Sequence, residues 1–371
     1  GGRGVDAMTA SLAVCCCLAP AAFYASLDEA LSPARSHSYI RAPPPRMQDR
    51  ALLLGEGWER EAQEFVETGR DWGAVRQVMR SSVLRDRPLP GDIELWLPSG
   101  LPDPPPATRS PTKKERQTWA LTIAYFGPAF DSFTWQPEAP ERTVMGCVQA
   151  AIEPLLCDRH GLFMATAGRT DAGVSATAQL ITFYSWEPLT LHALQSAINS
   201  AAPGKLKLRA AYRVPRSFHA TFSATWRRYV YLLPQKTSGP SPMIDLQCMN
   251  TMLGQLVGSA YDYAALGRGV PRGKNTTTTI LHARASQVFL PGDGSDGEQT
   301  SAIRFDIVGD RFLRRQVRCL VATAILAVRK SPNNERTLID LATSGDQRKT
   351  APAAPGIGLC FVQAGYDSYP Q

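Results

Sequence analysis

One loop of the sequence carries two residues that could act together in catalysis. Residues 168–173 read Gly-Arg-Thr-Asp-Ala-Gly, which places Arg169 two positions before Asp171. Glycine adopts backbone angles that other residues avoid, so the two glycines can form a tight loop that presents a side chain at a cleft. A nearby arginine favours an ionised aspartate, and a carboxylate can form covalent intermediates. Spacing alone favours a plainer interpretation, a surface turn with a local ion pair.

A group of arginines stands beside a strong apolar pattern near the end of the sequence. Arg311, Arg314, Arg315 and Arg318 fall at i, i+3, i+4 and i+7, so they would share one face if a helix began at the first of them. Such a run usually forms a solvated face. For Arg314 and Arg315, solvation and contact with phosphates stay open as alternatives.

The elements that must position these residues alternate between strands and helices from Trp119 onward. Alternating or short apolar runs predict strands, and apolar residues at helical spacing predict helices. Strands are expected near 121–125, 180–184, 210–213, 225–233, 279–289, 302–308 and 359–364. Helices are expected near 144–155, 191–198, 247–257 and 317–328. Thr143 is placed to cap the first of these helices. Clustered strands with helices between them predict an α+β fold with a mostly antiparallel sheet.

The bulk composition is that of a folded protein with a basic surface. Of the 371 residues, 44% are hydrophobic and 20% are charged, which suffices for a packed core. The formal net charge of +7 suits a polyanion such as nucleic acid, although many basic proteins bind none. The 8 cysteines include no C-x-x-C pair and no set with zinc-ligand spacing, so we expect free thiols, no metal and a reducing compartment.

The first 117 residues differ in composition from the rest. Residues 7–27 are apolar but interrupted by Pro20, which makes them short for a membrane span, and residues 32–46 are basic and lack acids. This order resembles an organelle-targeting leader, for a plastid or a mitochondrion. A disordered tail on a cytoplasmic or nuclear protein is the alternative.

Four parts follow from these patterns. We expect a leader or tail (1–47), a partly helical extension with a Pro-rich linker (48–117), and the two halves of a larger region (118–236 and 237–371). Within the extension, helices are expected over 51–67 and 72–79.

Several segments, in the same order, resemble the TruA-type tRNA pseudouridine synthases. Residues 168–174 (GRTDAGV) match the signature loop of that family. Residues 218–231 resemble its second motif, 312–318 its third and 358–359 its fourth. The resemblance covers roughly residues 118–367 and leaves the first 117 residues outside.

The resemblance implies an isomerase that needs neither cofactor nor metal. Pseudouridine synthases break the C1′–N1 bond of a uridine, rotate the uracil and rejoin it through C5. Asp171 then takes the part of the required aspartate, either as a nucleophile or as a base on the sugar. The resemblance does not decide between these two routes.

The resemblance also assigns substrate-binding residues. A target uridine must leave its stack to reach the carboxylate. By resemblance, Arg169 holds the flipped nucleotide or fills the vacated space, and Tyr229 stacks on the uracil. Arg318 pairs with the catalytic aspartate, and Leu359 lines the uracil pocket.

Basic residues near Tyr229 are further candidates for RNA contact. In a strand over 225–233, Tyr229 shares a face with Arg227, an arrangement suited to base stacking beside phosphates. A core position is the alternative for Tyr229. The predicted RNA-binding residues are Arg227, Arg228, His219, Arg314 and Arg315.

Fold and partners follow from the resemblance as expectations. We expect a pseudouridine synthase fold, with two similar α+β halves and mostly antiparallel sheets around a basic central cleft. The implied substrate is the anticodon stem-loop of tRNA, with the modified position left open. Bacterial members are homodimers, and whether this chain dimerises is also left open. No membrane partner is expected.

Two alternative functions stay open, and two residues differ from the pattern of the family. The chain could be a non-catalytic RNA-binding protein on the same fold, such as a part of an organellar ribosome, or an isomerase of ribosomal or messenger RNA. The presence of Asp171, Tyr229 and Arg318 together argues against the first, because RNA binding alone does not need that carboxylate. Ser175 stands where bacterial members usually have His, and Thr221 stands where Arg is common, which removes one phosphate contact.

Overall fold

The computed structural model describes residues 69–92, 100–102, 116–156, 162–235, 244–291 and 299–367. The chain divides into a unit of residues 1–46, which lies outside the described ranges, and a unit of residues 47–371. The expected leader and the helix predicted over 51–67 therefore lie outside the described residues, as does most of the Pro-rich linker. All that follows concerns the second unit.

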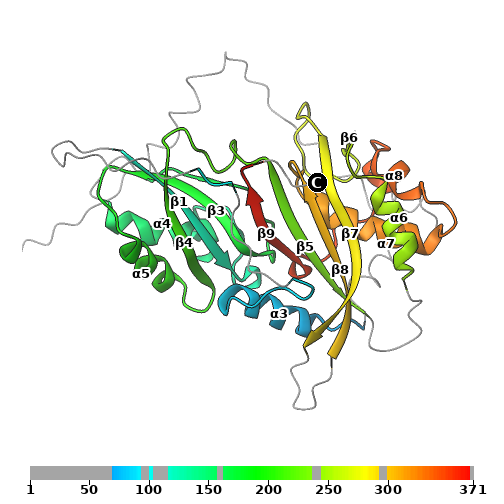
Figure 1. The fold of residues 1–371 in the computed structure, drawn as a ribbon, viewed down its shortest axis with the longest axis horizontal. Coiled ribbons are helices and arrows are strands. Elements are labelled where there is room, and N and C mark those ends of the chain that lie inside the picture. Colours follow the sequence, from blue (N-terminus) through cyan, green and yellow to red (C-terminus); the bar gives the residue numbers. More distant parts are fainter. Residues whose placement is uncertain are drawn as a thin grey trace, which may run out of the picture. The chain divides into compact units, whose positions relative to one another are not determined.

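A nine-stranded sheet organises the described residues (Figure 1). The strands lie in the order β4-β1-β3-β9-β5-β8-β7-β6, and β2 pairs with β3. Every pair is antiparallel except β3 with β9, so the prediction of a mostly antiparallel α+β fold is confirmed. The strands are β1 (Gln117–Tyr125), β2 (Met164–Thr166), β3 (Ser175–Ser185), β4 (Leu206–Val214), β5 (Trp226–Pro234), β6 (Ala260–Asp262), β7 (Thr277–Pro291), β8 (Gln299–Gly309) and β9 (Leu359–Gly365).

The parallel contact between β3 and β9 joins two halves of the sheet. It is short, with Ser175 opposite Cys360 and Ala176 opposite Phe361. On one side lie β4, β1, β3 and β2, and on the other lie β9, β5, β8, β7 and β6. Strand β5, which the predicted boundary after residue 236 assigns to the first half, pairs with β8 and β9 of the second.

Five of the described helices lie on one face of this sheet. Helices α4 (Val144–Ile152) and α5 (Leu191–Ala201) belong to the first half, and α6 (Leu246–Gly254), α7 (Gln316–Lys330) and α8 (Thr337–Ala342) to the second (Figure 1). The Thr143 hydroxyl accepts the Gly146 N–H at 3.0 Å, which satisfies a free donor of the first turn of α4 as its sequence predicts. One continuous core of buried side chains runs through both halves.

Helix α3 (Trp72–Leu84) covers the opposite face of the sheet. The helix predicted over 72–79 is present and extends to Leu84. A second apolar cluster joins it to β5, β7, β8 and β9 through Ala74, Val75, Val78, Met79, Leu89, Val230, Leu232, Val288, Leu290, Ala302, Cys360 and Val362. A helix from outside the segments that carry the motifs thus completes the core.

The described helices include none that is both long and apolar enough to cross a membrane.

Candidate active site

The loop that carries Asp171 connects β2 to β3 as a tight turn. The Val174 N–H donates to the Asp171 carbonyl at 3.2 Å, and Gly173 has a φ of 79°, in the left-handed region that favours glycine. Arg169 is exposed on this loop, whereas Asp171 is only partly exposed. The structure therefore presents the two side chains differently, one to solvent and the other toward the protein.

Asp171 forms an ion pair with Arg318, from the first turn of α7. Arg318 Nη1 lies 2.9 Å from Asp171 Oδ2, and the two side chains are 14% and 21% exposed. Arg318 Nε donates to the Ala354 carbonyl at 2.5 Å, and the Ala354 N–H donates to the Arg318 carbonyl at 3.2 Å. The guanidinium is thus oriented by backbone before it meets the carboxylate. Asp171 Oδ1 receives no hydrogen bond from the described residues.

Two glycines outside the loop allow backbone to press against it from both halves. A methyl group on Gly127 would lie 2.2 Å from the Val174 carbonyl oxygen, and one on Gly356 would lie 2.5 Å from that of Ala172. The Gly127 N–H also donates to Ser175 Oγ at 3.0 Å. Ser175 therefore has a structural function here, as an acceptor that holds the first glycine segment against the loop.

A hydrogen-bond network beneath the loop was not anticipated from the sequence. Gln179 Nε2 and the Thr166 hydroxyl both donate to the Gly168 carbonyl at 2.7 Å. The hydroxyls of Tyr125 and Thr170 lie 2.8 Å apart. Gln179 is the one buried amide in β3, whose other buried polar residues are serines and threonines, and its presence in a strand was the one signal available. These residues fix the loop from below, so they position Asp171 without touching it.

Tyr229 of β5 faces this loop from within the core. Its ring is 8% exposed and meets Phe312 and Phe361 edge-on, with centroids 5.3 and 5.2 Å away. A methyl group on Gly168 would lie 3.6 Å from its hydroxyl oxygen. Burial raises the pKa of Tyr229 well above its usual value, with Arg227 opposing this and Asp171 adding to it. The phenol is therefore neutral and protonated at physiological pH.

Leu359 is buried where β9 begins, opposite Tyr231 in the register with β5. The turn before it is close-packed, because a methyl group on Gly358 would lie 2.6 Å from the Tyr231 ring. Leu359 thus follows directly on the segment around Gly356, which contacts the Asp171 loop.

Arg227 holds backbone together near the site. Its guanidinium donates to the carbonyls of Ala167 at 3.2 Å, Ala224 at 3.0 Å, Asp310 at 2.5 Å and Thr221 at 2.9 Å. Four of the five donors of the arginine are thereby used within the protein. The structure thus gives Arg227 a clamping function, and its contact with RNA stays a prediction.

Arg228 lies on the other side of the sheet from Tyr229, because successive side chains of a strand point to opposite faces. It forms ion pairs with Asp306 and, at 3.2 Å, with Asp92. Arg304 contacts the same two carboxylates, Asp92 at 2.6 Å and Asp306 at 2.8 Å. Burial alone would raise the pKa of Asp306, but hydrogen bonds and charges from Arg228 and Arg304 hold it below its usual value. The structure does not place Arg228 with the other predicted RNA-binding residues.

Arg314 and Arg315 are exposed, but they do not share a helical face with Arg318. Helix α7 begins at Gln316, and Arg315 before it has a φ of 63°, so the helix cannot extend back to the earlier arginines. The basic face expected over 311–318 is therefore absent as a helix. The two side chains remain available to solvent or to a ligand.

His219 lies in the turn between β4 and β5. Its Nδ1 accepts the N–H groups of Thr221 at 3.1 Å and Phe222 at 3.3 Å. Thr221 in turn donates its hydroxyl to the Thr166 carbonyl at 2.6 Å. The turn that carries His219 is therefore fastened to the strand that leads into the Asp171 loop.

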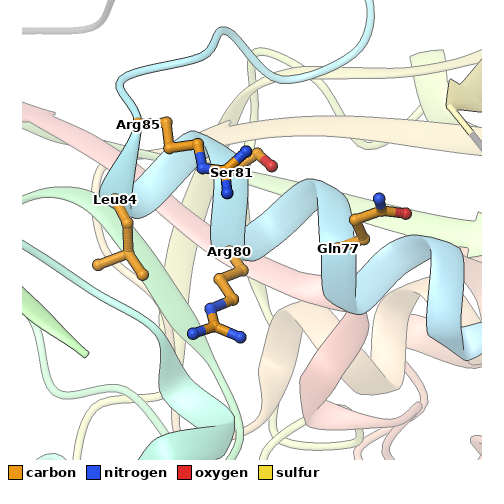
Figure 2. Close-up of a pocket in the computed structure, with 5 residues that line it drawn as sticks. All are labelled: Gln77, Arg80, Ser81, Leu84 and Arg85. Carbon is orange, nitrogen blue, oxygen red and sulfur yellow. The ribbon is translucent and has the colours of Figure 1, made fainter. Parts of the chain in front are cut away.

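A hollow of 340 Å³ lies elsewhere, on the outer surface of α3. Figure 2 shows its lining, which α3 and its C-cap residue supply: Gln77, Arg80, Ser81, Leu84 and Arg85. Its lining among the described residues contains no carboxylate and none of the candidate residues. Among the described residues, no group of three or more His, Cys, Asp or Glu is placed to hold a metal ion.

Comparisons with known proteins point to one family. A family model described as tRNA pseudouridine synthase matches residues 252–367. A protein of Roseiflexus sp. (strain RS-1) named tRNA pseudouridine synthase A is 30% identical over 258 residues, which are 67% of this chain and 90% of that protein. Proteins of the same name are 30% identical in Synechococcus sp. (strain ATCC 27144), covering 68% of this chain and 84% of theirs, and in Gloeobacter violaceus, covering 68% and 81%.

The sheet, the loop and the sequence matches together define the class of this protein, a pseudouridine synthase and hence an isomerase. Within that class, the chain belongs to the tRNA pseudouridine synthase A (TruA) family.

Proposed function

We propose that this protein converts uridine to pseudouridine in the anticodon stem-loop of tRNA, with Asp171 as the catalytic residue. The observation that carries the proposal is the ion pair of 2.9 Å between Asp171 and Arg318. A partly exposed carboxylate with one oxygen paired, in a loop held by both halves, suits a group that must attack a bound nucleotide. The relatives named for tRNA support the substrate class.

The proposed chemistry uses the charge of Asp171 in either of two ways. As a nucleophile the carboxylate forms a covalent bond to the nucleotide, and as a base it removes a proton from the sugar. Both routes need the ionised form, which the Arg318 guanidinium stabilises. The reaction rearranges one nucleotide and transfers no electrons overall, so it requires no redox cofactor. Because Arg318 is held by Ala354, it does not reorganise as the charge on the carboxylate changes.

Tyr229 and Leu359 supply the proposed apolar side of the uracil site. Tyr229 presents a protonated hydroxyl close to Gly168, at the start of the catalytic loop. Leu359 begins β9, directly after the segment around Gly356 that contacts the Asp171 loop. A flipped uracil between them would lie against an aromatic ring and an aliphatic side chain, as base recognition in flipping enzymes requires.

The proposed RNA contacts outside the pocket come from exposed residues. Arg169, Arg314 and Arg315 are exposed, and His219 lies in the turn fastened to β2. Exposed arginines can contact phosphates, and such contacts release counterions and make binding weaker as salt rises. Arg227 supports these contacts indirectly by holding the backbone, and Arg228 takes no part in them.

The decisive experiment maps pseudouridine in unmodified tRNA after incubation with the purified full chain, wild type beside Asp171→Asn. We expect wild type to modify a uridine of the anticodon stem-loop and the variant to modify none. The variant should keep its tRNA affinity and its melting temperature, because the replaced group is partly exposed and nearly isosteric.

Each other result changes the proposal in a defined way. Pseudouridine made by Asp171→Asn would remove this residue from the mechanism. Modification of ribosomal or messenger RNA in place of tRNA would change the substrate class. Tight tRNA binding with no product from either protein would favour a non-catalytic RNA-binding protein on this fold.

We also propose that residues 1–47 direct the protein to a plastid or a mitochondrion. The apolar segment followed by a basic, acid-poor segment supports this. Fusing residues 1–47 to a fluorescent protein tests it, because a leader carries the fusion into an organelle. A fusion that stays diffuse in the cytoplasm would leave this segment without a targeting function.

A further inference from the structure

Phe222 is the most exposed large apolar side chain among the described residues. Its side chain is 85% exposed, in the turn between β4 and β5. Single exposed apolar residues are ordinary, so exposure alone carries no argument. Here the ring also stacks on His219, with centroids 4.4 Å apart and planes 28° apart. One face of Phe222 is therefore covered by an imidazole, and the rest of the ring faces solvent.

The aromatic pair is held rigidly by its own turn. His219 Nδ1 accepts two backbone N–H groups, so in the neutral imidazole the proton lies on Nε2. The His219 N–H donates to Ser223 Oγ at 3.0 Å, and the Ser223 N–H donates to the His219 carbonyl at 2.9 Å. Hydrogen bonds thus fix both the backbone and the imidazole against which Phe222 rests. A rigid aromatic surface loses little entropy when a ligand binds to it.

The pair is anchored beside the Asp171 loop. Thr221 donates to the Thr166 carbonyl at 2.6 Å, and Arg227 joins the carbonyls of Thr221 and Ala167. Thr166 and Ala167 lead directly into the loop that carries Asp171. An RNA strand that delivers a uridine to Asp171 therefore passes close to this turn.

We infer that Phe222, supported by His219, forms a stacking platform for an unpaired RNA base next to the target uridine. The inference rests on the proposed function for the position of the RNA. A base laid on the free face of Phe222 would extend the existing two-ring stack to three rings. Stacking of this kind tolerates any base, because every base has a π-face. The platform would hold the strand open beside a flipped uridine and thereby raise affinity without reading sequence.

The test compares three variants of Phe222 with a matched control. Phe222→Ala removes the ring, Phe222→Leu keeps apolar bulk without a π-face, and Phe222→Tyr keeps the ring. The control is Phe289→Ala, which removes a ring that is 56% exposed on β7. Phe289 pairs with Ser301, far along the β7–β8 ladder from the Ile280–Gly309 pair beside β5. All proteins are full-length, and their melting temperatures are measured first.

Affinity for unmodified tRNA is the main readout, measured by filter binding at several salt concentrations. We expect Phe222→Ala and Phe222→Leu to bind about 5- to 150-fold more weakly, the range that loss of one base–aromatic stack produces. Phe222→Tyr and Phe289→Ala should bind like wild type. The slope of log Kd against log salt should not change, because a phenyl ring releases no counterions. An Arg314→Ala variant, by contrast, should reduce that slope.

The inference is overturned if Phe222→Ala and Phe222→Leu bind tRNA as tightly as wild type, or if Phe289→Ala weakens binding equally. Pseudouridine mapping on the same proteins separates this outcome from failure of the proposed function. A wild type that makes no pseudouridine, together with a loss of affinity confined to the ring-removing Phe222 variants, supports the platform and rejects the catalytic proposal. A wild type that does not bind tRNA overturns both.

Discussion

Asp171 Oδ2 and Arg318 Nη1 lie 2.9 Å apart although their residues are separated by 147 positions in the chain. The parallel pairing of β3 with β9 explains how they meet. Segments that precede two parallel strands lie at the same end of the sheet. The Asp171 loop precedes β3, and the segment that runs from Ala354 through Gly356 precedes β9. Arg318 bonds to that second segment, so the ion pair forms where the two halves of the sheet join.

Two substitutions of Tyr229 distinguish the contribution of its hydroxyl from that of its ring. Tyr229→Phe should keep the core packed and reduce pseudouridine formation only in steps that need the hydroxyl. Tyr229→Ala should abolish product and also lower stability by about 3–5 kcal/mol, the usual result of emptying a buried aromatic site. Single-turnover rates and urea unfolding measure the two effects. Activity unchanged in both variants would assign Tyr229 to the core alone.

The raised pKa of Tyr229 gives a pH prediction. A buried tyrosine with a raised pKa stays protonated in the folded protein while its unfolded counterpart ionises near pH 10. Its contribution to stability is therefore complete below about pH 10 and is lost as pH rises further. Urea unfolding at pH 8, 10 and 11 should show constant stability followed by a decline, and Tyr229→Phe should show a smaller decline.

Gly356→Ala should damage catalysis more than stability. The new methyl group would lie 2.5 Å from the Ala172 carbonyl, which is backbone and must shift, and Asp171 is the adjacent residue. We expect the rate of pseudouridine formation to fall at least about ten-fold, because small misplacements of catalytic groups have large effects on rate. Gly254→Ala is the control, since a methyl group there meets nothing within 4 Å. Equal activity of the two variants would show that the loop tolerates displacement.

Arg228→Met should weaken the fold and leave RNA binding intact. The side chain is 11% exposed and paired with Asp306 and Asp92, so its loss leaves two buried carboxylates to share the one cation of Arg304. Removing one member of a buried ion pair typically costs about 3–5 kcal/mol. The Kd for tRNA should stay within about two-fold of wild type, because this charge is paired within the protein on the face of the sheet opposite Tyr229. A large loss of affinity in a folded variant would return Arg228 to the RNA-binding residues.

The ion pairs of Arg228 and Arg304 with Asp306 also give a prediction for stability at low pH. The lowered pKa of Asp306 contributes stability that is present above about pH 4, near the unfolded value, and is lost as pH falls through the folded value. Wild-type stability should therefore decline below about pH 4. The stability of Arg228→Met should decline less over the same pH interval, because Asp306 has already lost one of its two arginine partners. If the free energy of unfolding falls equally with pH in wild type and in Arg228→Met, this account of Asp306 is wrong.

Truncation tests the contribution of α3. A fragment of residues 69–371 should fold and modify tRNA, whereas a fragment of residues 116–371 should be insoluble or much less stable. The shorter fragment exposes the apolar face that α3 covers on β5, β7, β8 and β9. As a point variant, Met79→Ala should cost about 2–5 kcal/mol, while Arg76→Ala, on the exposed side of the helix, should cost almost nothing. A stable, active 116–371 fragment would contradict this.

Local patterns predict much of the fold. The seven longer strands, helix α7 and the Thr143 cap depend on short-range spacing and are seen nearly as expected, whereas the three-residue strands β2 and β6 were not predicted. The start of α7 is different, because the left-handed backbone of Arg315 is a single-residue feature that arginine spacing does not reveal. The insertion of β9 between β3 and β5 depends on pairing between distant segments, so no local pattern contains it.

The candidate site is predictable only in part for a similar reason. The motif resemblance named Asp171 and Arg318, and the structure places them together. The partners of Arg227 are backbone carbonyls from separate segments, and carbonyls carry no sequence signal. Arg228 differs, because alternation along β5 already places it opposite Tyr229, and that inference was open from the sequence.

The position of β9 also has a consequence during synthesis. In chain order it follows every other described strand, yet in the sheet it lies between β3 and β5. On the ribosome, each half can therefore begin to fold before any strand is available to join them. A nascent chain that already contains Asp171 and Arg318 still lacks the segment that orients the guanidinium and supports the loop. If Asp171 acts as proposed, an incomplete translation product that lacks β9 should carry Asp171 and Arg318 without acting on RNA.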